Sequence, residues 1–177
     1  MNATRGDSST TPAMEVAMNS EERNSLIRRY AEGPALLEAT LAKVPAAALQ
    51  WRPASGKWTV HEVILHCADS ETNAHMRLRY LLAEPDPAIV PYDQDRWSID
   101  LQYHALPLEP ALATVRAVRA NTLPLLQRLS GAQWLKLGRH PEHPDGYGVE
   151  KWLRVYGENL EIHARQIERN QRAWDAR

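Results

Sequence analysis

The chain has 177 residues, of which 44% are hydrophobic and 24% charged, and its formal net charge is -1. This length suits one domain with a proper core and leaves no room for two ordinary domains. The near-neutral charge excludes the strongly basic surface of a typical nucleic-acid-binding protein. It also excludes the high net charge that keeps many chains disordered. We therefore expect one globular domain that does not bind nucleic acid.

The lack of a recognisable targeting signal and the single cysteine lead us to expect a cytoplasmic protein. No apolar run approaches the roughly 20 residues needed to span a bilayer, and the N-terminus lacks a basic segment followed by an apolar one. The single cysteine, Cys67, cannot form an internal disulfide, which fits a reducing compartment. Residues 1–17 are polar and lack apolar periodicity, so we expect a disordered leader before a domain spanning residues 18–177.

A first long helix is predicted over about residues 21–44, where apolar residues recur at helical spacing. Asn19 or Ser20 is placed to cap it. Pro34 lies inside this pattern and removes one backbone donor, so a kink or a break is expected there.

The second helix follows a clear start signal. Thr59 and Glu62 have the spacing of a capping box, and the apolar face that follows ends near Ala83. Residues 84–108 contain four prolines and a possible short helix over residues 93–103. A connection of this length can cross the whole bundle and join two parallel helices.

Two more helices complete the pattern. The third is expected to begin at Glu109 or Pro110, with a possible kink at Pro124, and the fourth covers residues 147–172. Residues 130–148 are rich in turn formers, and no long strand-like alternation occurs. The sequence therefore predicts an all-α four-helix bundle with almost no strand, in up-down-down-up order with a long crossover between the second and third helices.

Side chains that could bind a metal lie on two of these helices. On the second helix, His66 shares one edge with Glu62 and Asp69, and on the fourth, Asn159 and His163 lie about 40° apart at 100° per residue. Two imidazoles and one amide thus face the bundle interior. A histidine in a core stripe more often satisfies a local hydrogen bond than binds a metal, so spacing alone leaves both interpretations open.

Two longer motifs carry a family resemblance. The run WRPASGKWTVHEVILHCADSE is followed about ninety residues later by GVEKWLRVYGENLEIHARQIERN. Together they resemble the DinB-like family of metal-binding four-helix bundles, with its YfiT-like and DinB_2-type members. In the first motif the matching residues are Trp51, Pro53, Gly56, Lys57, Trp58, Thr59 and His66. In the second, which in the family reads His-x-x-x-His-x-x-Gln-Ile, they are His163, Gln166 and Ile167, with Asn159 at the first histidine.

The resemblance implies a divalent-metal site of three histidines with water in the open position. His66 and His163 keep two of these ligands, and Asn159 takes the place of the third. A neutral amide is a weaker ligand than imidazole for zinc or nickel, which prefer nitrogen donors. The site is therefore expected to bind its metal weakly or to be empty.

Other side chains could compensate for the missing imidazole. Glu62 or Asp69 could do so from the second helix, and His140 or His143 from the loop before the fourth. The two loop histidines more commonly take a solvated or turn role. Cys67 points about 100° away from the histidine before it, so we interpret it as a small buried hydrophobe.

Two functions follow from the resemblance. One is a metal-dependent hydrolase or thiol transferase that acts on a small-molecule substrate or thiol, with Glu62 or Asp69 as the base. The alternative is a non-catalytic dimeric bundle that binds a small ligand or partner through a degraded metal site, which Asn159 favours. A homodimer is expected in either case, because small bundles often bury apolar helix surface against a second copy and family members are commonly dimeric.

Overall fold

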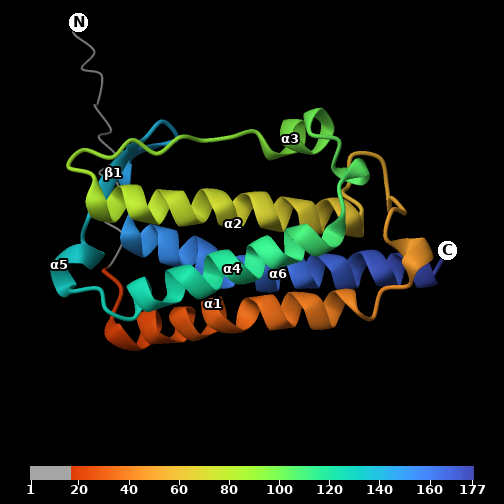
Figure 1. Ribbon diagram of the computed structural model, residues 1–177, viewed down its shortest axis with the longest axis horizontal. Coiled ribbons are helices and arrows are strands. Elements are labelled where there is room, and N and C mark those ends of the chain that lie inside the picture. The colour runs from red at the N-terminus through yellow and green to blue at the C-terminus, as the bar shows by residue number, and fades with distance from the viewer. Residues whose placement is uncertain (1–16) are drawn as a thin grey trace, which may run out of the picture.

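Four long helices carry the fold in the computed structural model, which describes residues 17–177. They are α1 (Ser20–Leu41), α2 (Val60–Ala83), α4 (Leu108–Leu126) and α6 (Val149–Asp175). Helices α1 and α6 run in one direction, and α2 and α4 run in the other (Figure 1). The predicted four-helix bundle and its up-down-down-up order are confirmed. The predicted leader lies, apart from residue 17, outside the described residues.

A long crossover joins the parallel helices α2 and α4. It runs back along α2 from one end of the bundle to the other (Figure 1). Within it lie the short helix α3 (Gln94–Asp100) and the single turn η2 (Tyr103–Ala105). Asp93 caps α3, because its Oδ1 accepts a hydrogen bond of 3.0 Å from the backbone N–H of Arg96. The crossover and its short helix are where the sequence places them.

Local capping sets the first residue of two long helices. Asn19 accepts a 2.9 Å hydrogen bond from the backbone of Glu22, at the start of α1. At the start of α2, Thr59 and Glu62 each accept a hydrogen bond from the other's backbone N–H, at 3.1 and 2.8 Å. These pairs satisfy backbone donors that the first turn of a helix leaves free.

Helix α1 is not divided at Pro34, because a side chain from another helix replaces the missing hydrogen bond. Proline has no N–H to donate to the carbonyl of Tyr30, four residues earlier. Arg119 of α4 donates to that carbonyl at 2.6 Å. Gly33 makes room for this contact, since a Cβ there would lie 2.6 Å from the arginine Nη1.

The same arginine ties all four long helices together. Its Nη2 donates to Glu71 of α2 at 2.6 Å and to the carbonyl of Tyr156 of α6 at 2.9 Å. Its guanidinium also lies 4.0 Å from the centre of the Tyr30 ring of α1. Arg119 and Glu71 are buried, and they separate the apolar core into two clusters, one toward each end of the bundle. The core is therefore built around one buried ion pair.

A short hairpin precedes α6, and the expectation of almost no strand is wrong for this segment. Strands β1 (Leu137–His140) and β2 (His143–Gly148) pair in antiparallel register. The turn between them is Pro141–Glu142, which carries no Asn-Gly signal, and the register shifts inside the ladder. The crossover holds the hairpin through a 2.8 Å hydrogen bond from the backbone N–H of Ile89 to the carbonyl of Arg139.

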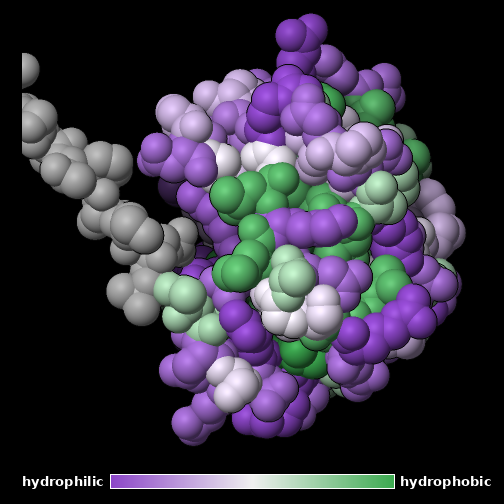
Figure 2. Space-filling view, turned by 90° about the vertical axis from the view of Figure 1, so that its left-hand side faces the viewer, coloured by the Kyte–Doolittle hydropathy of each residue, from purple (hydrophilic) through white to green (hydrophobic). Residues whose placement is uncertain are grey.

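The end of the bundle that carries the hairpin and α5 (Gly131–Trp134) exposes both apolar and hydrophilic side chains (Figure 2). Figure 2 shows apolar side chains gathered in the middle of this end, among hydrophilic ones. Leu135 and Leu137, next to α5 and in β1, are more than half exposed. None of the described helices combines the length and apolar character that a membrane span requires.

The buried ion pair gives a first prediction. Arg119→Met should lower the free energy of unfolding by about 3–5 kcal/mol, because it leaves the Glu71 carboxylate buried without its partner. The double variant Arg119→Met, Glu71→Met should recover most of this loss, since no unpaired charge remains. Urea denaturation of the three proteins tests both statements. A single variant as stable as the parent would show that the pair does not hold the core.

Candidate metal centre

A cavity of about 320 Å³ lies between α2, α6, the hairpin and the crossover. His66, Asn159 and His163 line it, and so do His140 and His143. The structure thus brings all five nitrogen-bearing side chains singled out in the sequence to the wall of one cavity. They differ in which ring atoms remain free to bind a ligand.

His66 is a buried, neutral imidazole with an unused nitrogen. The centre of its ring lies 4.8 Å from that of His163, and its Nδ1 is buried without a hydrogen-bond partner among the described residues. Burial and the neighbouring His163 lower the pKa of His66 to about 3. The ring is therefore neutral at physiological pH, which is the form that binds a metal.

The Gly-Lys-Trp-Thr motif places this histidine. Trp58 packs against His66 with 4.6 Å between the ring centres. Its carbonyl accepts a 2.9 Å hydrogen bond from Asn170 of α6, and the next residue, Thr59, caps α2. The motif therefore fixes the start of α2 and covers one side of the His66 ring.

His163 has one nitrogen occupied and the other free. Its Nδ1 lies 3.1 Å from the amide oxygen of Gln166, one turn later on α6. Because that oxygen only accepts, Nδ1 carries the proton and the lone pair is on Nε2. Burial lowers the pKa of His163, which keeps the ring neutral. Gln166, which the sequence marked only as a motif match, thus orients the histidine as outer-shell partners do in metal sites.

Asn159 faces the same cavity one turn before His163. Its Nδ2 lies 3.4 Å from Ser70 Oγ and 3.4 Å from Glu71 Oε1. A carboxylate accepts but does not donate, so the amide turns its nitrogen toward Glu71 and keeps Oδ1 for another contact. Among residues 17–177 no three His, Cys, Asp or Glu side chains form a group that could hold a metal. The available donors are therefore two imidazoles and one amide oxygen, a set that fits zinc or nickel weakly.

The two hairpin histidines have the opposite arrangement of ring protons. His140 Nδ1 accepts a 3.1 Å hydrogen bond from the backbone N–H of Glu142. His143 Nδ1 lies 3.1 Å from Lys151 Nζ, and an ammonium group can only donate. Each neutral ring therefore carries its proton on Nε2 and presents an N–H rather than a lone pair. Neither is ready to replace the missing family ligand.

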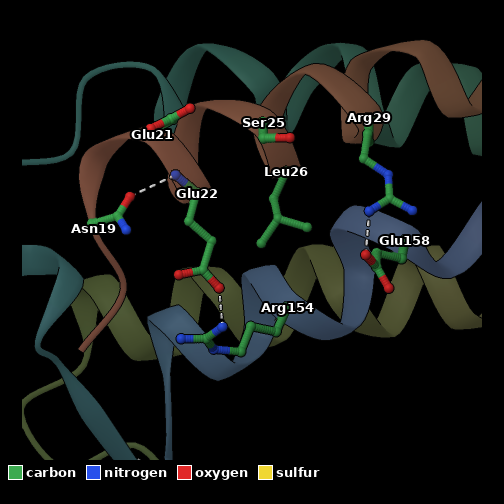
Figure 3. A pocket seen from close by; sticks show the side chains of 8 residues that line it. All are labelled: Asn19, Glu21, Glu22, Ser25, Leu26, Arg29, Arg154 and Glu158. Atoms are coloured by element: carbon green, nitrogen blue, oxygen red, sulfur yellow. Dashed lines mark hydrogen bonds and ion pairs between the residues drawn. The ribbon is translucent and has the colours of Figure 1, made fainter. Parts of the chain in front are cut away.

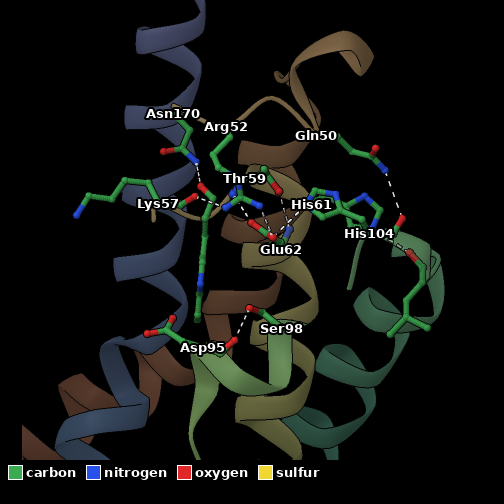
Figure 4. A network of polar contacts seen from close by, with 12 residues as sticks. Gln50, Arg52, Lys57, Thr59, His61, Glu62, Asp95, Ser98, His104 and Asn170 are labelled. Atoms are coloured by element: carbon green, nitrogen blue, oxygen red, sulfur yellow. Dashed lines mark hydrogen bonds and ion pairs between the residues drawn. The ribbon is translucent and has the colours of Figure 1, made fainter. Parts of the chain in front are cut away.

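The two carboxylates considered in the sequence are committed elsewhere and do not line the cavity. Glu62 accepts hydrogen bonds from Arg52 at 2.7 Å and from His104 at 3.0 Å, besides capping α2 (Figure 4). Asp69 accepts a hydrogen bond from the hydroxyl of Tyr103. The structure thus gives neither carboxylate the place of a replacement ligand or of a base at His66.

Cys67 is also outside the cavity. Its side chain is fully buried among apolar residues, and burial raises the pKa of the thiol. A buried protonated thiol is neither a ready nucleophile nor a metal ligand. The interpretation of Cys67 as a small buried hydrophobe agrees with this environment.

A larger hollow of about 640 Å³ lies between α1 and α6, but it has no imidazole in its lining. Figure 3 shows its walls crossed by the ion pairs Glu22–Arg154 and Arg29–Glu158. Two of its carboxylates, those of Glu22 and Glu158, are paired with arginines from the facing helix. The histidine cavity is therefore the better candidate for a metal centre.

Comparison with known proteins places the chain in a family. The family model described as the DinB superfamily matches residues 29–167. The chain belongs to the DinB superfamily. Among relatives in it, "Putative metal-dependent hydrolase OB0782" of Oceanobacillus iheyensis is 35% identical over 144 residues, which are 81% of this chain and 83% of the relative. "Putative metal-dependent hydrolase YfiT" of Bacillus subtilis is 28% identical over 140 residues, 79% of each chain.

A solved structure that is similar to this chain has the same fold. YfiT from Bacillus subtilis, described as "a probable metal-dependent hydrolase with an unusual four-helix bundle topology", superposes with a TM-score of 0.84. The two chains are 26% identical, and the match covers 92% of this chain and 93% of YfiT. The fold and the family expected from the two sequence motifs are thus confirmed.

The neutral state of His66 predicts an acid-sensitive stability. In the unfolded chain this histidine takes up a proton below about pH 6.5, whereas in the fold it stays neutral down to about pH 3. Acidification across this window therefore favours unfolding. When the pH is lowered from about 7.5 to about 5.0, the free energy of unfolding should fall for the parent. For His66→Gln this fall should be smaller by about 2 kcal/mol. Urea denaturation of the metal-free proteins at both pH values checks this, and equal losses would contradict it.

Proposed function

We propose that the chain binds a divalent transition-metal ion, zinc or nickel, and acts as a metal-dependent hydrolase on a small-molecule substrate. His66 and His163 are the ligands, with the amide oxygen of Asn159 as a weaker third donor. The observation that carries the proposal is the pair of neutral imidazoles at the cavity wall, one of them oriented by Gln166. The names of the relatives in the DinB superfamily support it.

The protein's own residues set the environment for such a reaction. A bound zinc or nickel ion would supply a Lewis acid and lower the pKa of a water molecule. Tyr156 lines the cavity, and burial raises the pKa of its phenol, which therefore stays protonated as a donor. Trp58 covers His66 from one side. A low-molecular-weight thiol is the alternative substrate, because soft thiolates bind these metals well.

Asn159 supports a second candidate function. With two imidazoles instead of three, the site holds its metal less tightly, and the bundle could then bind a small ligand or partner without catalysis. This function predicts no metal in protein purified without a nickel column. Metal analysis of such protein separates it from the hydrolase, which retains zinc or nickel near one equivalent.

Substitution of the ligands tests the metal site directly. His66→Ala and His163→Ala should each abolish binding of zinc and nickel to metal-free protein, because one imidazole and an amide are too few. Asn159→His should restore a third imidazole and raise the affinity by about 10 to 100-fold. Calorimetric titration of each variant with both metals gives the dissociation constants.

The hairpin histidines provide matched controls. His140→Ala and His143→Ala should change the affinity little, because their Nδ1 atoms are occupied and their Nε2 atoms carry protons. An unchanged affinity in Asn159→His, together with loss of binding in either hairpin variant, would place the metal at the hairpin instead.

The expected assembly remains a separate proposal, a homodimer. Val155 and Ile162, seven residues apart on α6, leave 44% and 45% of their surface exposed, as apolar contacts with a second copy would require. Light scattering at tens of micromolar protein should give about twice the mass of one chain. A monomer at that concentration would contradict the proposal.

A further inference from the structure

Arg77 lines the same cavity as the two candidate ligand histidines, but at some distance from them. It lies eleven residues after His66 on α2, about 16 Å along the helix axis at 1.5 Å per residue. Eleven residues are close to three full turns, so the two side chains leave the helix on nearly the same face. The cavity therefore has an inner end at the imidazoles and an outer end at Arg77.

Among residues 17–177, no carboxylate forms an ion pair with Arg77. A guanidinium is always ionised in proteins. Its two terminal nitrogens donate to neutral groups, the hydroxyl of Tyr156 at 3.0 Å and the carbonyl of Val90 at 2.7 Å. Its Nε is buried and has no hydrogen-bond partner in residues 17–177. In that part of the chain, Arg77 is also the only lysine or arginine of the cavity lining.

The hairpin adds neutral donors at this outer end. His140 and His143 each carry a proton on Nε2, because their Nδ1 atoms accept hydrogen bonds. The positive charge of Arg77 is among the causes that lower the pKa of His140, which places the two groups within electrostatic reach of each other. Glu142, the carboxylate in the lining, is exposed and forms no ion pair with Arg77. This end is thus rich in donors, and its guanidinium forms no ion pair with Glu142, although that carboxylate is close enough to offset part of the lowering of the His140 pKa.

We propose that Arg77, with the Nε2–H groups of His140 and His143, binds an anionic group of the substrate, a carboxylate or a phosphate. The proposal rests on the proposed function and adds to it the class of substrate. The anion occupies the outer end while the reacting part of the substrate reaches the imidazoles of His66 and His163. Arg77 is a specificity residue in this arrangement, because it selects charged over neutral substrates.

Anion titrations of the full-length, metal-depleted chain test this assignment. Nuclear magnetic resonance titrations with inorganic phosphate and with succinate give dissociation constants without a metal to attract the anion. At least one anion should bind. Arg77→Gln should lower the affinity for that anion by about 10-fold or more, as expected for a lost hydrogen bond to a charged group. Binding of phosphate alone would identify a phosphoryl substrate, and binding of succinate alone a carboxylate.

Matched variants make the outcome specific. Arg79→Gln removes the same charge two residues away on α2, where the arginine side chain binds Asn121 and His75. This variant should bind the anion as the parent does. If Arg77→Gln does not fold, Arg77→Lys keeps the charge but loses the fork of donors, and should bind the anion with an affinity several-fold below that of the parent.

Two results would overturn the proposal. One is a parent protein that binds neither anion at about 50 mM. The other is an affinity of the Arg77 variants equal to that of Arg79→Gln. His163→Ala should lose zinc and nickel yet keep the anion, so the anion site and the metal site can fail separately. Absence of metal binding in a parent that still binds the anion through Arg77 would contradict only the proposed function.

Discussion

A charged side chain in the middle of a helix bundle must find its partners there, because water cannot supply them. Arg119 meets this demand with a group from every other long helix: the carbonyl of Tyr30 on α1, the carboxylate of Glu71 on α2 and the carbonyl of Tyr156 on α6. These contacts tie the four long helices to one another at one buried guanidinium, between the two apolar clusters of the core.

The same ion pair reaches the candidate metal centre. Glu71 accepts from Arg119 on one side and lies 3.4 Å from the amide nitrogen of Asn159 on the other. Asn159 is the residue that departs from the family motif, and the amide suits this position because it gives a donor to Glu71 and keeps an oxygen for the cavity. A histidine there would face the same carboxylate, as ligand histidines do when a carboxylate orients them from the outer shell. Glu71 thus connects the buried ion pair to Asn159 at the wall of the cavity.

Features set by neighbours in sequence could be predicted, and features set by distant contacts could not. The capping box of Thr59 and Glu62 and the apolar faces of the helices are local, and the structure has them as expected. The continuity of α1 through Pro34 depends on Arg119, which lies 89 residues after the carbonyl that it binds. The hairpin is short and its register shifts, so its sequence shows no regular alternation of apolar and polar residues. For the site, the family motif indicated His66, Asn159 and His163 as neighbours, and the structure brings them to one cavity. The hydrogen bonds that distinguish His163 from the hairpin histidines are an exception, because their partners Gln166, Glu142 and Lys151 are near in sequence. Which ring nitrogen each partner meets depends on side-chain orientation, which residue spacing does not give.

In the proposed site, two imidazoles, from His66 and His163, hold the metal, and the hairpin histidines stay out of the ligand set. X-ray absorption spectroscopy of the zinc-loaded, full-length protein counts the imidazoles around the metal. We expect two imidazoles and otherwise light oxygen scatterers, with no sulfur from Cys67. Three or more imidazoles in the parent protein would bring His140 or His143 into the ligand set and contradict the proposed site.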